Sequence, residues 1–224
     1  MKIIPIKWQN IQTVFLDMDG TLLDLHFDNH FWLEHMPKSY AEKHSITLDK
    51  AREALMANYK KYSGSLQWYC LDHWQETLDM DIVSLKHEVA DRIALRSHVI
   101  EFLEYLHSLQ KRVVLLTNAH NKTVDLKFDY IDIQKYFDRV ITAHDVGLAK
   151  EQPGFWQALQ EMEEFNKKQS LFIDDNLDVL QAADDFGIGY LLAIHQPDSQ
   201  QESMDTGKFT AIECYSQIMQ VMQE

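Results

Sequence analysis

The chain has 224 residues, 46% of them hydrophobic and 25% charged, which is typical of a folded globular protein and allows one large domain or a core with an inserted subdomain. Its net charge of −14 at pH 7 repels nucleic-acid backbones and anionic membranes, so we expect neither as a partner, and a site for an anionic substrate must supply local positive charge. No apolar run approaches the roughly 20 residues that span a bilayer, the first residues have no cleavable signal pattern, and two cysteines far apart in sequence suit a cytoplasmic location.

The first predicted element is a buried strand that ends in the sequence Asp17-Met18-Asp19-Gly20-Thr21. Ligands of open α/β sheets bind at the carboxyl ends of the strands. Two carboxylates one residue apart repel each other and need a cation or a proton between them. The pattern therefore indicates a hard metal ion beside a reactive carboxylate, whereas the simplest structural alternative is an Asx turn after a strand.

The segment from residue 24 to residue 96 has no strand pattern and is rich in aromatic side chains. Apolar residues recur there at helical spacing, which predicts helices over residues 51–62, 67–78 and 82–94. We expect this segment to be an all-helical cap inserted after the first strand, above the carboxyl edge of the sheet. The remaining residues, 1–23 and 97–224, are then expected to form a discontinuous catalytic core.

From residue 97 onward, helical and strand patterns alternate. The predicted helices cover residues 99–110, 122–137 with a possible break near residue 132, 155–164 and 177–186. The predicted strands cover residues 113–116, 140–142, 171–173 and 188–194, and they are continuously apolar. This alternation predicts an α/β fold with a Rossmann-like parallel sheet that helices cover on both faces.

Three further clusters follow strand ends or precede helices. Thr117 and Asn118 can donate to a phosphate oxygen, although such residues commonly cap helices. Lys150 can neutralise a phosphate or hold nearby carboxylates, although a single lysine is commonly a solvated surface residue. Asp174 and Asp175 follow an apolar strand, and Asp175 also suits a helix N-cap. Because the carboxyl ends of parallel strands share one edge, we expect all these groups to meet there.

The four clusters, in this order, resemble the motifs of the haloacid dehalogenase-like (HAD) hydrolase superfamily over residues 14 to about 187. That resemblance implies a Rossmann-like core, a helical cap and Mg²⁺-dependent phosphatase activity. Within the superfamily the chain looks most like bacterial GMP/IMP 5′-nucleotidases, on the segments 19–25, 27–29, 68–72, 115–120 and 171–175. One departure is Ala149 before Lys150, where family members often carry a proline next to the lysine.

Phosphoryl transfer needs a nucleophile, neutralised phosphate oxygens and a protonated leaving group. We expect Asp17 to be the nucleophile that forms an aspartyl-phosphate, and Asp19 to be the general acid and then the general base. The resemblance implies that Mg²⁺ binds Asp17, the backbone carbonyl of Asp19 and Asp174 or Asp175, between which spacing does not decide. The expected phosphate-binding residues are Gly20, Thr21, Thr117, Asn118 and Lys150.

Substrate choice is expected to come from the cap. Trp68 and Tyr69 are candidates for stacking on a purine, or alternatively for packing between cap helices. Asp28 and Asn29 are candidates for ribose or base contacts, or alternatively for a helix N-cap. The expected substrate is a purine nucleoside 5′-monophosphate, while a sugar phosphate or another small phosphometabolite is the main alternative. A non-catalytic module that binds a partner or carries a phospho-aspartate is the second alternative.

Four other polar side chains are expected to have no role in the reaction. Cys70 and Cys214 are too far apart in sequence to suggest a disulfide framework or a zinc cluster, and each is expected to pack as a small buried apolar residue. His120 and His144 lie near strand ends and are expected to be surface histidines.

Overall fold

The structure is a computed structural model and describes residues 3–219. Its centre is a parallel sheet with the strand order β3-β2-β1-β4-β5-β6. The strands are β1 (Thr13–Leu16), β2 (Arg112–Thr117), β3 (Arg139–Thr142), β4 (Ser170–Asp174), β5 (Tyr190–Ile194) and β6 (Ala211–Ile212). The Rossmann-like α/β fold expected from the sequence is confirmed, and the short edge strand β6 is an addition to it.

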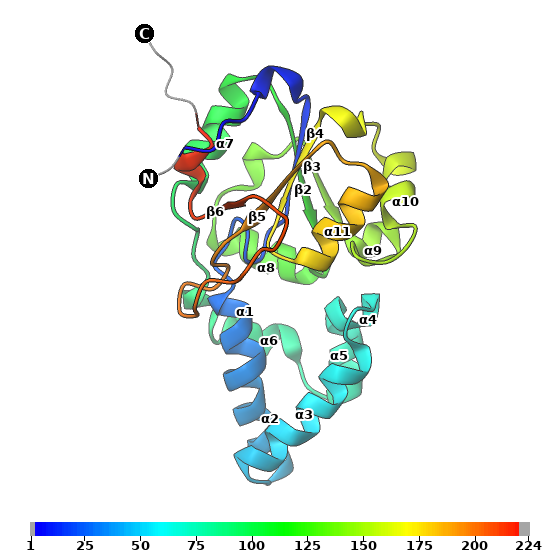
Figure 1. Ribbon diagram of the computed structural model, residues 1–224. Coiled ribbons are helices and arrows are strands. Elements are labelled where there is room, and N and C mark those ends of the chain that lie inside the picture. The colour runs from blue at the N-terminus through cyan, green and yellow to red at the C-terminus, as the bar shows by residue number, and fades with distance from the viewer. Residues whose placement is uncertain (1–2, 220–224) are drawn as a thin grey trace.

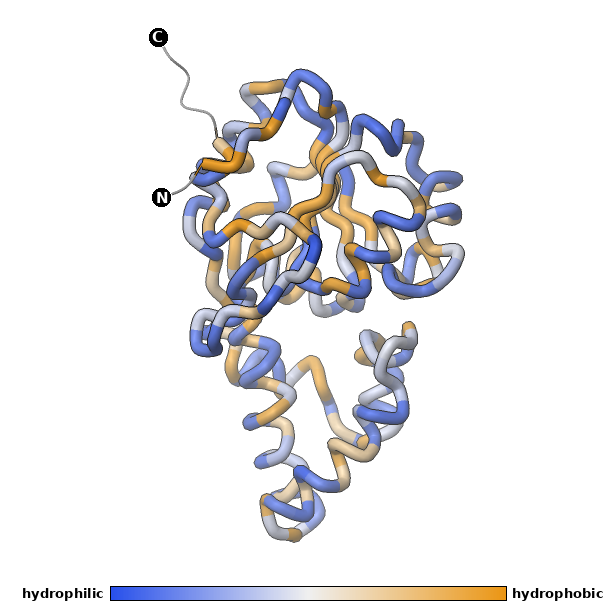
Figure 2. Tube along the Cα trace, in the orientation of Figure 1, coloured by the Kyte–Doolittle hydropathy of each residue, from blue (hydrophilic) through white to orange (hydrophobic). Residues whose placement is uncertain are grey.

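Helices cover both faces of this sheet (Figure 1). They are α7 (Val99–Ser108), α8 (Asn121–Tyr130), α9 (Ala143–Val146), α10 (Phe155–Met162) and α11 (Leu177–Phe186). Along β1, Val14 and Leu16 pack into one apolar cluster with α7 and α8, whereas Phe15 packs into another with α10 and α11. Because both faces are buried, the central positions of the strands are apolar on both sides and polar residues are confined to the strand ends. Figure 2 shows the strands as the most continuously hydrophobic part of the chain.

The residues between β1 and α7 form a separate group of helices, called the helical lobe here (Figure 1). They are α1 (His26–His30), α2 (Met36–His44), α3 (Leu48–Tyr62), α4 (Leu66–Tyr69), α5 (Leu71–Leu78) and α6 (Ile82–His87). The lobe has its own apolar cluster, in which Phe27, Phe31, Tyr59 and Trp74 are buried. Leu126 of α8 belongs to the same cluster, so the lobe packs on the core through α8. The division of the chain at residues 23/24 and 96/97 stays a prediction.

Several element boundaries differ from those expected. The helix expected over residues 67–78 is interrupted at Cys70, whose φ of −83° and ψ of 111° are extended, and this separates α4 from α5. The helix expected over 82–94 ends at His87, and a 3-10 turn follows at Ala90–Arg92. Helix α8 ends at Tyr130, near the expected break, because Ile131 is extended. No helix in the part of the chain described has the length and apolar character to cross a membrane.

Candidate active site

The first motif forms a tight turn directly after β1. Gly20 has a φ of +80°, and a Cβ atom there would lie 2.5 Å from Oδ2 of Asp175. Only glycine combines this left-handed backbone with so close a neighbour. The turn thus brings the residues after β1 against the residues after β4, which are more than 150 positions away in sequence.

Lys150 joins the ends of β1, β2 and β4. Its buried Nζ donates to Oδ1 of Asp17 at 2.5 Å, to Oδ2 of Asp174 at 2.6 Å and to the carbonyl oxygen of Leu116 at 3.1 Å. This lysine and these carboxylates, expected from the sequence to meet, are in direct contact. Ala149, which precedes the lysine where family members often carry a proline next to it, is fully buried and does not prevent this geometry.

The site holds more carboxylates than cations. Carboxylate oxygens of the acidic triad, Asp17, Asp174 and Asp175, all lie within 4.8 Å of one another, and Lys150 is the cation bonded to two of them. Burial raises the pKa of Asp17 to about 6, although Lys150 opposes the shift. Burial and the charges of Asp174 and Asp17 raise the pKa of Asp175 well above its usual range. Burial alone would lower the pKa of Lys150, but the negative charges of Asp17 and Asp174 raise it above its usual value. The lysine therefore stays charged.

Such a triad fits a hard divalent cation. Mg²⁺ prefers oxygen ligands, and it is commonly held by one or two carboxylates together with substrate phosphate oxygens. Crowded carboxylates whose pKa values are raised are destabilising until a cation neutralises them. Asp17, Asp174 and Asp175 therefore fit a Mg²⁺ site, and both later aspartates are close enough to take part.

Replacing Asp175 with asparagine should stabilise the metal-free protein at pH 8 by about 1 kcal/mol or more, because one crowded charge is removed. A carboxyl group whose pKa is raised on folding contributes stability at low pH and loses it as pH rises, so the advantage of the variant should vanish below about pH 4. Urea unfolding in a chelator at both pH values measures this. Asp178→Asn is the control, since Asp178 is exposed in the first turn of α11 and its loss should slightly destabilise the protein. An Asp175→Asn protein that is less stable than the parent at pH 8 would contradict the argument.

Asp19 belongs to a second network, which links the core to the helical lobe. Lys127 of α8 is buried, and its Nζ donates to Oδ1 of Asp19 and to Oδ2 of Asp28, the latter at 2.5 Å. Lys86 of α6 donates to the other oxygen of Asp28 at 2.8 Å. Burial raises the pKa of Asp19 to about 6, with Lys127 opposing it, whereas the two lysines more than offset burial at Asp28 and hold the pKa of Asp28 well below its usual range.

Neither lysine of this network was expected from the sequence. A signal was present: Lys127 follows Thr123 and Val124 by four and three positions, on the buried face of α8, and Lys86 follows Ile82 by four positions. A lysine on the buried face of a helix needs an acidic partner, so its position alone indicates an ion pair. Their acidic partners, Asp19 and Asp28, lie in other segments of the chain, so the helix patterns alone could not identify them.

A third network surrounds Thr117 and Asn118 at the end of β2. Thr117 is buried, and its Oγ1 accepts the backbone N–H of Ala119 at 3.0 Å, which leaves its hydroxyl proton available to a ligand. Asn118 accepts the backbone N–H of Lys150 at 2.9 Å and donates to Glu151 at 2.9 Å. Tyr69 of the helical lobe donates to the other oxygen of Glu151 at 2.9 Å. Glu151, which the sequence analysis did not single out, thus connects the lobe to the core.

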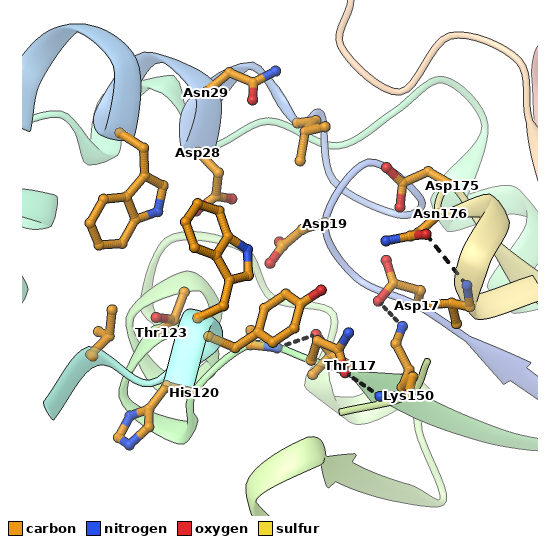
Figure 3. Close-up of a pocket in the computed structure, with 18 of the residues that line it drawn as sticks. Asp17, Asp19, Asp28, Asn29, Thr117, His120, Thr123, Lys150, Asp175 and Asn176 are labelled. Atoms are coloured by element: carbon orange, nitrogen blue, oxygen red, sulfur yellow. Dashed lines mark hydrogen bonds and ion pairs between the residues drawn. The ribbon is translucent and has the colours of Figure 1, made fainter. Parts of the chain in front are cut away.

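These networks border one cavity of about 360 Å³ between the lobe and the sheet (Figure 3). Its lining includes all predicted site residues except Gly20 and Thr21: Asp17, Asp19, Asp28, Asn29, Trp68, Tyr69, Thr117, Asn118, Lys150, Asp174 and Asp175. Thr21 is fully buried beneath the turn, and its Oγ1 has no hydrogen-bond partner among residues 3–219. Asn29 reaches the cavity while donating to Asp198 at 2.7 Å. Carboxylates and Lys150 line the cavity at the sheet, and aromatic side chains line it at the lobe.

Comparisons with known proteins agree with this architecture. The family model of haloacid dehalogenase-like hydrolases matches residues 11–187. The chain is 40% identical over 196 residues to the GMP/IMP nucleotidase YrfG of Escherichia coli (strain K12), and this match covers 88% of each chain. Among solved structures, a HAD phosphatase from Thermococcus onnurineus superposes with a TM-score of 0.73 at 20% identity, over 90% of this chain and 93% of that one. The HAD-hydrolase YfnB of Bacillus subtilis, whose structure is bound to magnesium, gives a TM-score of 0.59 at 17% identity, over 90% and 93% of the two chains.

The family match covers the four motifs, the helical lobe, strands β1 to β4 and helix α11. The relatives and solved structures extend the similarity to about nine-tenths of the chain. With its motifs in order and in contact at one sheet edge, the chain belongs to the family of haloacid dehalogenase-like hydrolases.

Proposed function

We propose that this chain is a Mg²⁺-dependent phosphomonoesterase that acts through an aspartyl-phosphate on Asp17 and takes purine nucleoside 5′-monophosphates, GMP and IMP, as substrates. The observation that carries the proposal is the contact of Lys150 with Asp17 and Asp174 at the floor of a cavity large enough for a small ligand. That arrangement orients a carboxylate nucleophile beside a fixed positive charge. The similarity to relatives named GMP/IMP nucleotidases supports the substrate class.

In the first step, an oxygen of Asp17 attacks phosphorus while the bond from phosphorus to the ribose oxygen breaks. Lys150 donates to Oδ1 of Asp17, so Oδ2 is the oxygen left to attack. Asp19 gives its proton to the leaving ribose oxygen, for which a pKa raised to about 6 suits it better than an ordinary carboxyl group. The free hydroxyl of Thr117 donates to a phosphate oxygen.

In the second step, Asp19, now ionised, accepts a proton from water as that water attacks phosphorus. The bond between phosphorus and Asp17 breaks, and inorganic phosphate leaves with the carboxylate restored. Lys127 keeps a positive charge beside Asp19 in both steps. Mg²⁺, held by Asp17, Asp174, Asp175 and the backbone carbonyl of Asp19, would neutralise the phosphate oxygens when bound.

The aromatic end of the cavity suits a purine. Trp68 and Tyr69 line it, and aromatic faces hold nucleobases by stacking. Trp68 also packs edge-to-face on Tyr59 and Trp74, with ring centroids 5.5 and 5.8 Å away, so the packing role considered as an alternative is present as well. One ring can serve both purposes, because its neighbours fix the orientation of the face that a base would contact.

A phosphate-release panel over GMP, IMP, CMP, UMP and sugar phosphates, with and without Mg²⁺, tests the proposal. We expect the highest kcat/KM for GMP and IMP and no release in a chelator. A preference for sugar phosphates would be consistent with a phosphatase but would reject purine nucleotides as its substrates. No release from any phosphomonoester would reject the phosphatase and favour a partner-binding module. The cytoplasmic location of the protein remains a prediction.

Trp68→Leu should raise the KM for GMP about fivefold or more, because base stacking contributes about 1–3 kcal/mol. The KM for para-nitrophenyl phosphate should change less, since that substrate has no purine. Steady-state kinetics on both substrates give the comparison. Leu33→Ala is a suitable control, because Leu33 also lines the cavity but is half exposed and has no aromatic face. Equal losses on the two substrates would mean that Trp68 acts only through packing.

Lys127→Met should move the alkaline limb of the pH profile of kcat/KM to higher pH. Lys127 lowers the pKa of Asp19, so its removal raises that pKa further above 6 and keeps the general acid protonated over a wider range. The maximal rate should fall as well, because the positive charge beside Asp19 is lost. Lys135→Met, at an exposed lysine paired with Asp132, is the control and should leave the profile unchanged. If the alkaline limb does not move, Asp19 is not the group that protonates the leaving ribose oxygen.

A further inference from the structure

A cluster of nitrogen and sulfur side chains lies beside the cavity and takes no part in the proposed reaction. Cys70 separates α4 from α5, His120 is the N-cap residue of α8, and His144 lies in α9. One potential ligand atom from each of the three lies within 4.8 Å of the others. The imidazole rings of His120 and His144 have centroids 4.6 Å apart and meet edge-to-face. All three side chains are half-buried, so neither the buried cysteine nor the surface histidines expected from the sequence are found.

The polar atoms of this Cys–His cluster are poorly satisfied by the protein itself. Both ring nitrogens of His144 are buried and find no hydrogen-bond partner within residues 3–219. Nδ1 of His120 accepts the backbone N–H of Lys122 at 3.3 Å, and Sγ of Cys70 accepts that of His73 at 3.4 Å, both of them long bonds. Two buried ring nitrogens without a hydrogen-bond partner are unusual in a folded protein and suggest a ligand.

We propose that Cys70, His120 and His144 form a site for a thiophilic divalent cation, with Zn²⁺ as the ion that this donor set fits best. Zinc sites combine thiolate and imidazole ligands, and three protein ligands leave one position open. Thiolate and neutral imidazole are the forms of these side chains that bind metals. The carboxylate of Asp72 lies 3.8 Å from Nε2 of His120 and is paired with Lys122 at 2.5 Å.

This site is distinct from the acidic triad in both place and chemistry. The triad offers oxygen atoms alone and suits Mg²⁺, whereas the Cys–His cluster offers nitrogen and sulfur. In Figure 3 the ring of His120 points away from Asp17 and Asp19. Cys70 belongs to the helical lobe, and the two histidines belong to the core. A bound ion would therefore tie α4 and α5 to the ends of β2 and β3.

Co²⁺ titration of the full chain in saturating Mg²⁺ tests the site, because Mg²⁺ occupies oxygen ligands and Co²⁺ reports a thiolate ligand by a charge-transfer absorption band. We expect that band in the parent protein, displacement of Co²⁺ by Zn²⁺ at about one equivalent, and a higher melting temperature with Zn²⁺. Amide hydrogen exchange in α4 and α5 should slow on Zn²⁺ addition, since the ion bridges lobe and core. None of these readouts depends on phosphatase activity.

Cys70→Ser and His144→Gln should each abolish the absorption band and the shift in melting temperature. Cys214→Ser is the matched control, because it removes the other cysteine of the chain and should leave both readouts unchanged. The inference fails if the parent gives no thiolate band, or if the band survives in Cys70→Ser. If Zn²⁺ binds but amide exchange in α4 and α5 does not change, the bound ion does not link the helical lobe to the core. The parent measurements stand even if a variant folds poorly.

Discussion

Replacing Asp17 with asparagine should reduce phosphate release about 10⁴-fold or more, because the amide cannot attack phosphorus to form the covalent intermediate. The fold should be retained, since an amide has nearly the same volume and can still accept from Lys150 at the position of Oδ1. Substrate binding should also be retained, because the phosphate-binding groups Thr117 and Lys150 are untouched. Release from GMP with Mg²⁺, measured beside circular dichroism and equilibrium binding, checks all three points.

The matched control for this experiment is Asp129→Asn, which makes the same chemical change at an exposed position of α8. That variant should turn over at the parent rate. Mass spectrometry of rapidly acid-quenched mixtures should find a phosphorylated peptide containing Asp17 in the parent and in Asp129→Asn. Phosphate release near the parent rate in Asp17→Asn, or a phosphopeptide elsewhere in the chain, would overturn the assignment of the nucleophile.

The convergence of Asp17, Thr117, Lys150 and Asp174 was predictable from the sequence for a topological reason. Each residue follows a strand or precedes a helix, and the apolar strands between them indicate a parallel sheet. In such a sheet every strand ends at the same edge, so no knowledge of strand order was needed to bring these residues together. The observed order places β1 between β2 and β4, which puts Asp17 at the centre of the edge.

The network around Asp19 was not predictable in the same way. Lys127 and Lys86 lie on helices, where a side chain's partner depends on how the helix is rotated and docked rather than on where a strand ends. Pairing of Lys127 with Asp28 also depends on how the helical lobe packs on α8, a contact between segments that have no common sheet. Pairing of Lys86 with Asp28 depends on how α6 packs on α1 within the lobe. Pairing of Glu151 with Tyr69 has the same origin, since it too crosses from lobe to core.

The cap residues show where sequence patterns stop being informative. Trp68 and Tyr69 were readable as aromatic, but base stacking and helix packing use the same apolar faces and the same spacing. Only the three-dimensional arrangement puts both rings on the cavity wall, and it also gives each of them a protein neighbour: Tyr59 and Trp74 for Trp68, and Glu151 for Tyr69. Helix ends were the other weak point, because Cys70 adopts extended backbone within an otherwise regular helical pattern.

Replacing Lys150 with methionine should damage both activity and stability. Methionine fills a similar volume but leaves Asp17 and Asp174 buried, adjacent and without their common cation. Removing one partner of a buried ion pair typically costs about 3–5 kcal/mol. Loss of a fixed charge at the reacting phosphate should lower kcat about 10²-fold to 10³-fold. Urea unfolding of the metal-free protein and phosphate release from GMP measure the two effects.

The loss of stability in Lys150→Met should depend on pH in a defined direction. Without the lysine, the pKa values of Asp17 and Asp174 rise further, so both carboxyl groups stay protonated in the folded state at mildly acidic pH. Protonated carboxyl groups need no cation, and the difference from the parent should therefore be large at pH 8 and shrink towards pH 5. Lys208→Met is the control, because its ion pair with Asp184 is exposed on both sides and should contribute no more than about 1 kcal/mol at either pH. A destabilisation that is equal at pH 5 and pH 8 would mean that lost packing, rather than two uncompensated carboxylates, accounts for the effect.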